Sequence, residues 1–159
     1  MEFKSIMHVS FFTGRMDEMI RFYTEVLGGE LKIVTRAKAY ANRPNGAYYQ
    51  DYLEDPERIV IVYIEVAPGQ FIELFPAKEG QLPRREWNDS VDYSHFALLC
   101  DDIYAMREKL EARGLVFDTQ ISKGPSETYQ MWAHDPDGNK FEIMQFTENS
   151  YQLVGHIDE

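Results

Sequence analysis

Residues 8–29 read HVSFFTGRMDEMIRFYTEVLGG, and they define the unit from which the chain is built. The short apolar segment His8–Phe12 predicts a β-strand. The segment Met16–Leu27 predicts a helix, because its apolar residues recur every three or four positions and share one face. Gly28 and Gly29 end this helix, as glycine commonly does after a last turn. The apolar face consists of Met16, Met19, Ile20, Tyr23, Val26 and Leu27.

The second half of the chain repeats this plan. His95–Leu99 predicts a strand, and Asp101 and Asp102 can cap the helix that follows. Gly114 ends that helix, whose apolar face consists of Ile103, Met106 and Leu110. Three strands are predicted after each helix, at Leu31–Lys38, Arg58–Val66 and Gln70–Pro76 in the first half and at Leu115–Ile121, Thr128–His134 and Lys140–Phe146 in the second.

The sequence therefore predicts an α+β fold made of two βαβββ modules. Turn residues join the last two strands of each module, Ala67-Pro68-Gly69 in the first and Asp135-Pro-Asp-Gly-Asn139 in the second. The predicted boundaries are 1–78 for the first module, 79–90 for a linker, 91–148 for the second module and 149–159 for a polar C-terminal tail.

Composition excludes some classes of partner. The chain has 16 basic and 27 acidic residues, for a net charge of −11, and such an acidic protein is a poor ligand for nucleic acid or an anionic membrane. The longest apolar run, Ile59–Ile64, is too short to span a bilayer. The start of the chain lacks the pattern of a signal peptide, and Cys100 is the only cysteine. We therefore expect a cytoplasmic protein with a small-molecule substrate.

The two halves differ in length at one place. More residues separate His8 from Glu73 along the sequence than separate His95 from Glu142. Most of the additional residues lie in Ala39–Glu57. This excursion is rich in turn residues and tyrosines, and it predicts a long loop or hairpin. It is either a surface flap or a lid that places tyrosines over a site.

Four polar side chains interrupt the apolar strands at matching places. His8 and His95 lie in the first strand of each module, and Glu73 and Glu142 lie in the last. A charged or imidazole side chain is costly to bury in an apolar strand unless a partner compensates it. Two imidazoles and two carboxylates that converge on one point would bind a divalent metal ion. Because side chains alternate along a strand, the neighbours of these residues face the other way and can pack under the helices.

At these residues the chain resembles the vicinal oxygen chelate superfamily, which includes glyoxalase I, bleomycin resistance proteins and extradiol dioxygenases. The resemblance covers about residues 5–147 and rests on five segments. These are Ile6-Met-His8, Phe22-Tyr23-Thr-Glu-Val-Leu-Gly28, Phe71-Ile-Glu73, Ser94-His95 and Asp135-Pro-Asp-Gly-Asn-Lys-Phe-Glu142. It implies paired modules that form a curved mixed-sheet trough, usually in a homodimer, with a metal in the trough.

The ligand set His8, Glu73, His95 and Glu142 resembles that of glyoxalase-I-like lyases and isomerases. The resemblance implies Glu142 as the catalytic base, with Glu73 shuttling a proton on the opposite face. A substrate with adjacent oxygens would chelate the metal and lose a proton through an enediolate. The ion could be Ni, Co, Zn, Mn or Fe, because a mixed nitrogen and oxygen set suits them all. Candidates for the substrate wall are Phe12, Tyr49, Tyr52, Met131 and Trp132.

Other functions stay open on the sequence. His8, His95 and Glu142 could bind Fe(II) in an extradiol-type dioxygenase, and an aromatic trough could serve a non-catalytic protein that binds an antibiotic or metabolite. Glutathione is not established as a substrate. Phe11-Phe12-Thr13 replaces the arginine, and Leu74-Phe75-Pro76-Ala77 lacks the asparagine, that bacterial glyoxalase I usually has for glutathione.

Overall fold

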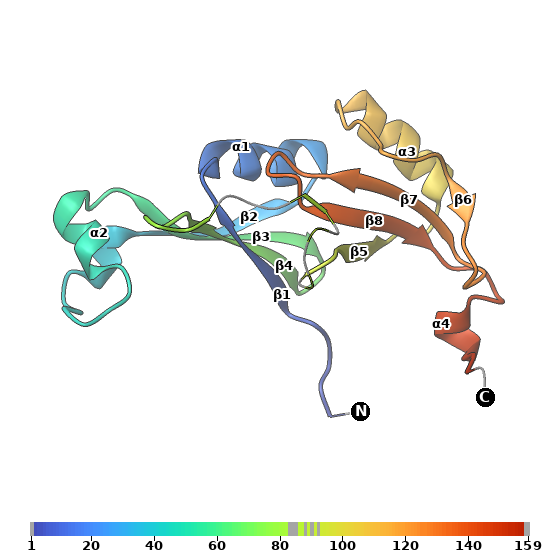
Figure 1. Ribbon diagram of the computed structural model, residues 1–159, viewed down its shortest axis with the longest axis horizontal. Helices are drawn as coiled ribbons and strands as arrows, with labels where there is room; N and C mark the ends of the chain where they lie inside the picture. The colour runs from blue at the N-terminus through green and yellow to red at the C-terminus, as the bar shows by residue number, and fades with distance from the viewer. Residues whose placement is uncertain (1, 83–85, 88, 90, 92, 158–159) are drawn as a thin grey trace. The chain divides into compact units, whose positions relative to one another are not determined.

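The chain divides into two compact units, Met1–Leu82 and Pro83–Glu159, each built on a four-stranded sheet (Figure 1). The structure is a computed structural model, and it describes residues 2–82, 86, 87, 89, 91 and 93–157. The predicted linker 79–90 includes residues 83–85, 88 and 90, which lie outside the described residues. In the described residues, no helix combines the length and apolar character needed to cross a membrane.

The first unit has the strand order β1-β4-β3-β2. Strand β1 pairs with β4 in parallel, and the other neighbours are antiparallel, so the sheet is mixed. The elements are β1 (His8–Thr13), α1 (Met16–Arg21), the π-helical turn η1 (Phe22–Val26), β2 (Glu30–Arg36), the 3₁₀ turn η2 (Ala37–Tyr40), α2 (Tyr49–Glu54), β3 (Ile59–Ala67) and β4 (Gln70–Pro76).

The second unit repeats this topology with the order β5-β8-β7-β6. Its elements are β5 (Phe96–Leu99), α3 (Ile103–Ala112), β6 (Ser122–Lys123), β7 (Tyr129–His134), β8 (Lys140–Gln145) and α4 (Tyr151–Val154). Strand β5 runs parallel to β8, just as β1 runs parallel to β4. The predicted α+β fold with a repeated βαβββ module is confirmed.

Each unit buries one face of its sheet beneath its main helix (Figure 1). In the first unit Met19 and Tyr23 are fully buried, as are the inward residues of β3 and β4, among them Val62 and Leu74. In the second unit Ile103 and Leu110 of α3 are buried in the same way, along with Phe141 and Ile143 of β8. Because side chains alternate along a strand, Glu73 and Glu142 each lie on the face of their own sheet that the helix does not cover.

Predicted turn and cap residues work as expected in the second unit. The Asp102 carboxylate accepts hydrogen bonds from the backbone N–H groups of Tyr104 and Ala105, both at 3.0 Å, and so caps α3. In the turn before β8, Asp135 accepts hydrogen bonds from the backbone of Asp137 and Asn139 at 3.0 and 2.8 Å. This turn fixes where β8 begins and therefore which way Glu142 points.

Two predicted segments differ from the structure, and a third has more structure than its composition indicates. The excursion 39–57 is not a hairpin, because it folds into part of η2 and the short helix α2. The strand predicted at 115–121 does not form, and only β6 pairs with β7 at that edge. The predicted polar tail 149–159 contains the short helix α4: Ser150 is buried, and the N–H of Tyr151 donates to the carbonyl of Ser126 at 2.9 Å, while residues 158 and 159 lie outside the described residues.

Gly29 allows the chain to leave the first helix close to β3. A Cβ at this position would lie 2.8 Å from the Ile64 side chain, 2.8 Å from the Tyr23 carbonyl oxygen and 2.9 Å from that of Glu65. We expect Gly29→Ala to lower the free energy of unfolding by about 1–3 kcal/mol, because two of these contacts are with backbone that cannot move aside. Urea denaturation measures the loss. Gly14→Ala is the control, since its Cβ would meet nothing within 4 Å, and an equal loss there would contradict this explanation.

Candidate metal centre

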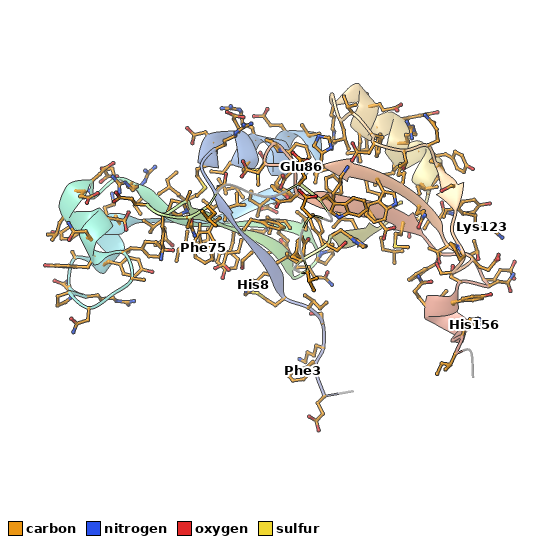
Figure 2. All side chains as sticks on the ribbon, viewed as in Figure 1. Phe3, His8, Phe75, Glu86, Lys123 and His156 are labelled. Carbon is orange, nitrogen blue, oxygen red and sulfur yellow. The ribbon has the colours of Figure 1, made fainter. Side chains whose placement is uncertain are left out.

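In the first unit, β1 and β4 bring an imidazole and a carboxylate together (Figure 2 labels His8). Ser10 on β1 is the direct neighbour of Glu73 on β4, and His8 lies two residues earlier on the same face. His8 Nε2 lies 3.3 Å from Glu73 Oε2. The Glu73 side chain is 8% exposed and that of His8 is 39% exposed, so the carboxylate is buried and the imidazole is partly open to solvent.

The second unit builds the same pair from β8 and the residue that precedes β5. Ala97 is the direct neighbour of Glu142, and His95 again lies two residues earlier. His95 Nε2 lies 3.4 Å from Glu142 Oε2, with side-chain exposures of 32% and 9%. The Ser94 hydroxyl lies 2.9 Å from His95 Nδ1. With Nδ1 as the donor to that hydroxyl, Nε2 would carry a lone pair able to bind a cation; without a cation, Nε2–H facing Glu142 is the favourable arrangement.

The two pairs differ in the residues that flank each carboxylate. Ser10 Oγ donates a hydrogen bond of 2.5 Å to Glu73, and Tyr63 on β3 lies directly opposite Glu73 in the strand register. The neighbouring Glu73 carboxylate, together with burial, raises the pKa of Tyr63 to about 12. Glu142 instead has Ala97 and Trp132 as its neighbours across the sheet, and neither has a hydroxyl group.

An aromatic ring packs against each of the two histidines. The His8 and Tyr63 rings meet edge to face at 5.8 Å between centroids, and the His95 and Trp132 rings meet at 4.6 Å. Burial raises the pKa of Glu142, and the neighbouring His95 opposes this rise. A carboxylate in this setting binds a proton more strongly than an exposed one, which is what a catalytic base needs.

The geometry of each pair suits two adjacent ligands of one cation. Two atoms bound at about 2.1 Å to the same ion lie about 3.0–3.4 Å apart when the bond angle is about 90–110°. The observed separations of 3.3 and 3.4 Å fall in this range. Neither unit, in the part that the structure describes, gathers three or more His, Cys, Asp or Glu side chains at one point. In each unit, the described residues bring one of the predicted imidazoles next to one of the predicted carboxylates.

The residues predicted for the substrate wall have different positions. Phe12 is 51% exposed and lies on the same face of its strand as His8. Trp132 lies beside His95, but Met131 is fully buried next to Ile143 on the helix-covered face of its sheet, so its side chain cannot contact a substrate. Tyr49 and Tyr52 belong to α2, and the centroids of their rings lie 5.8 Å apart.

Sequence reasoning missed Ser10 and Tyr63 as partners of Glu73. Ser10 shares a face with His8, and alternation alone could have placed it near the site. Tyr63 required the register between β3 and β4, in which Tyr63 lies directly opposite Glu73. That register depends on the turn at Ala67–Gly69 and on a bulge, and neither can be located to the residue in a single sequence.

Comparison with known proteins identifies the family. Residues 5–143 match the model of the Glyoxalase/Bleomycin resistance protein/Dioxygenase superfamily, and the chain belongs to this superfamily. A relative from Vibrio parahaemolyticus, named a probable lactoylglutathione lyase, is 27% identical over 152 residues, which cover 94% of this chain and 96% of the relative.

Solved structures share the fold. A lactoylglutathione lyase from Agrobacterium tumefaciens matches with a TM-score of 0.61 at 19% identity, over 98% of this chain and all of that one. A glyoxalase family protein from Enterococcus faecalis matches with a TM-score of 0.66 at 20% identity, over 91% of this chain and 99% of that one. At these identities the likeness concerns the fold alone.

Proposed function

We propose that this protein is a divalent-metal-dependent lyase or isomerase of the glyoxalase type. Its substrate would be a small molecule with oxygens on adjacent carbons, such as the adduct of a 2-oxoaldehyde with a thiol. We further propose that His8, Glu73, His95 and Glu142 bind the metal. A complete set of four ligands then combines a first unit with a second unit. These two units come from one chain or from two chains of a homodimer in the cytoplasm.

One observation carries the proposal. The same arrangement of imidazole and carboxylate occurs at corresponding positions of both units, with Nε2–Oε2 separations of 3.3 and 3.4 Å. Isolated buried carboxylates are costly, and a pair of matched sites is a strong sign of a common ligand. The combined set of two nitrogens and two oxygens suits Ni, Co, Zn, Mn or Fe, and the donor chemistry does not select among them.

The protein's own residues supply the proton chemistry. A cation held by these four residues would polarise the substrate oxygens and make the neighbouring C–H bond more acidic. Glu142 is the proposed base, because it is buried and no hydroxyl group lies opposite it on the neighbouring strands. Glu73 would receive or return a proton on the other side of the substrate. Its hydrogen bond from Ser10 fixes its position during that exchange.

Metal content and activity test the proposal together. Protein purified without chelator should contain about one transition-metal ion for each set of four ligands, and it should convert the hemithioacetal of methylglyoxal and glutathione or of another thiol. Oxygen uptake with catechols after anaerobic loading with Fe(II) would instead identify a dioxygenase. Absence of bound metal after incubation with Ni²⁺, Co²⁺ and Zn²⁺ would overturn the proposal and favour a binding protein.

A further inference from the structure

The excursion of the first unit packs against Phe75, which lies on the same sheet face as the His8–Glu73 pair. Phe12 on β1 and Phe75 on β4 are direct neighbours, two residues beyond Ser10 and Glu73. Side chains two residues apart share a face and are separated by about 7 Å along the strand. The Phe12 and Phe75 rings therefore extend that face away from the carboxylate, and Figure 2 shows Phe75 farther toward α2 than His8.

Tyr48 comes from the excursion and closes this aromatic surface. It is buried against Ala37 and Val60, and Phe75 packs against the same cluster. The Phe12 and Phe75 rings lie 5.7 Å apart, and half of the Phe12 side chain remains exposed. A large apolar side chain left open beside a polar pair is a feature of small-molecule sites.

Lys78 adds one positive charge to this surface. Its Nζ lies 5.9 Å from the centre of the Phe12 ring and 5.4 Å from that of Tyr48. No carboxylate among the described residues lies within ion-pairing distance of it, whereas Lys32 and Lys38 are both in ion pairs. An unpaired ammonium group held over aromatic rings, in a protein with a net charge of −11, is placed to attract an anion.

We infer that Phe12, Phe75, Tyr48 and Lys78 form a second binding subsite, which selects substrates with an apolar or aromatic body and an anionic group at its far end. This inference rests on the proposed function, because it places the chelating end of the substrate at the His8–Glu73 pair. The chelating end and the anionic end of the substrate would be separated by about the length of one aromatic ring. The anionic group is a carboxylate or a phosphate, which an ammonium group binds in the same way.

Binding of two matched probes tests this subsite. Mandelate has a chelating 2-hydroxy acid and a phenyl ring, and 4-carboxymandelate adds one carboxylate at the far end of that ring. Titration calorimetry with the metal-loaded protein should show at least about tenfold tighter binding of 4-carboxymandelate, as expected for one added charge-assisted contact. Lys78→Met should abolish this preference, and Lys78→Arg should retain most of it. Lys109→Met, at an exposed position of α3, is the control and should leave it unchanged.

Several outcomes would overturn the inference. These are equal binding of the two probes by the unmodified protein, or a preference that survives in Lys78→Met or disappears in Lys109→Met. Metal content measured on the same samples keeps this test separate from that of the proposed function. Unmodified protein without metal contradicts the proposed function, whereas metal-loaded protein without a preference for the dianion contradicts only the subsite.

Discussion

Glu142→Gln should lower turnover by about 10²–10⁴-fold while the protein keeps its bound metal. The amide has the size of the carboxylate and retains an oxygen that can face a cation, but it cannot accept a proton at neutral pH. Glu142 is the carboxylate that has His95 as its partner and that faces Ala97 and Trp132 across the sheet. Steady-state kinetics on a hemithioacetal that the unmodified protein converts, with metal analysis of the same sample, measures both effects.

Glu111→Gln provides the matched control. Glu111 is an exposed carboxylate of the same unit, and its side chain forms an ion pair of 2.9 Å with Arg107 one turn earlier on α3. Loss of such a pair changes stability little and should not alter turnover. A metal-loaded Glu142→Gln protein with full activity would show that another group is the base. A Glu142→Gln protein that has lost its metal would show that the carboxylate charge is needed for binding.

Much of the fold could be predicted because local patterns and tertiary packing agree. Spacing of apolar residues placed Met19 and Tyr23 on one helical face, and both are fully buried. Aspartate is a preferred residue directly before a helix, and Asp102 caps α3 by accepting two backbone hydrogen bonds. Alternation also predicted that the sequence neighbours of Glu73 would pack under a helix, and Ile72 is buried there.

Predictions were wrong where structure depends on contacts distant in sequence. The excursion forms short helices because Tyr48 and Ala37 pack against Val60, and helices this short have weak signals of their own. Residues 115–121 look like a strand, but Asp118 and Thr119 bond to the Trp132 backbone in place of a regular ladder. Met131 follows a different rule: it precedes Trp132 in the sequence, but one step along a strand moves a side chain to the other face, where Met131 is fully buried.

His95→Ala should remove most of the bound metal with little change in the fold of the metal-free protein. Loss of an outer partner of a ligand already weakens metal binding about 10–100-fold, so loss of a direct ligand should exceed that range. The His95 side chain is 32% exposed, and its removal leaves no large cavity in the core. Titration with Ni²⁺ or Zn²⁺ measures affinity, and thermal unfolding in chelator measures stability.

His134→Ala is the matched control for this variant. His134 also belongs to the second unit, and its Nδ1 lies 2.9 Å from a carboxylate oxygen of Asp118. It is therefore a histidine with an acidic partner that we do not place in the metal centre. Equal losses of metal affinity in His95→Ala and His134→Ala would contradict the assignment of His95 as a specific ligand.

Co-expression of His8→Ala with His95→Ala should reveal which units share a metal. If each centre uses both units of one chain, every chain in the mixture has a defective centre, and metal binding stays as low as in either variant alone. If each centre combines the first unit of one chain with the second unit of its partner, mixed dimers contain one centre with all four ligands. Random pairing then restores about one quarter of the centres, because half of the dimers are mixed and each has one intact centre. Affinity purification through two different tags isolates the mixed dimers, in which the restored fraction rises to about one half. Recovery of metal and turnover in the same proportion would show that the restored centre is also the active one.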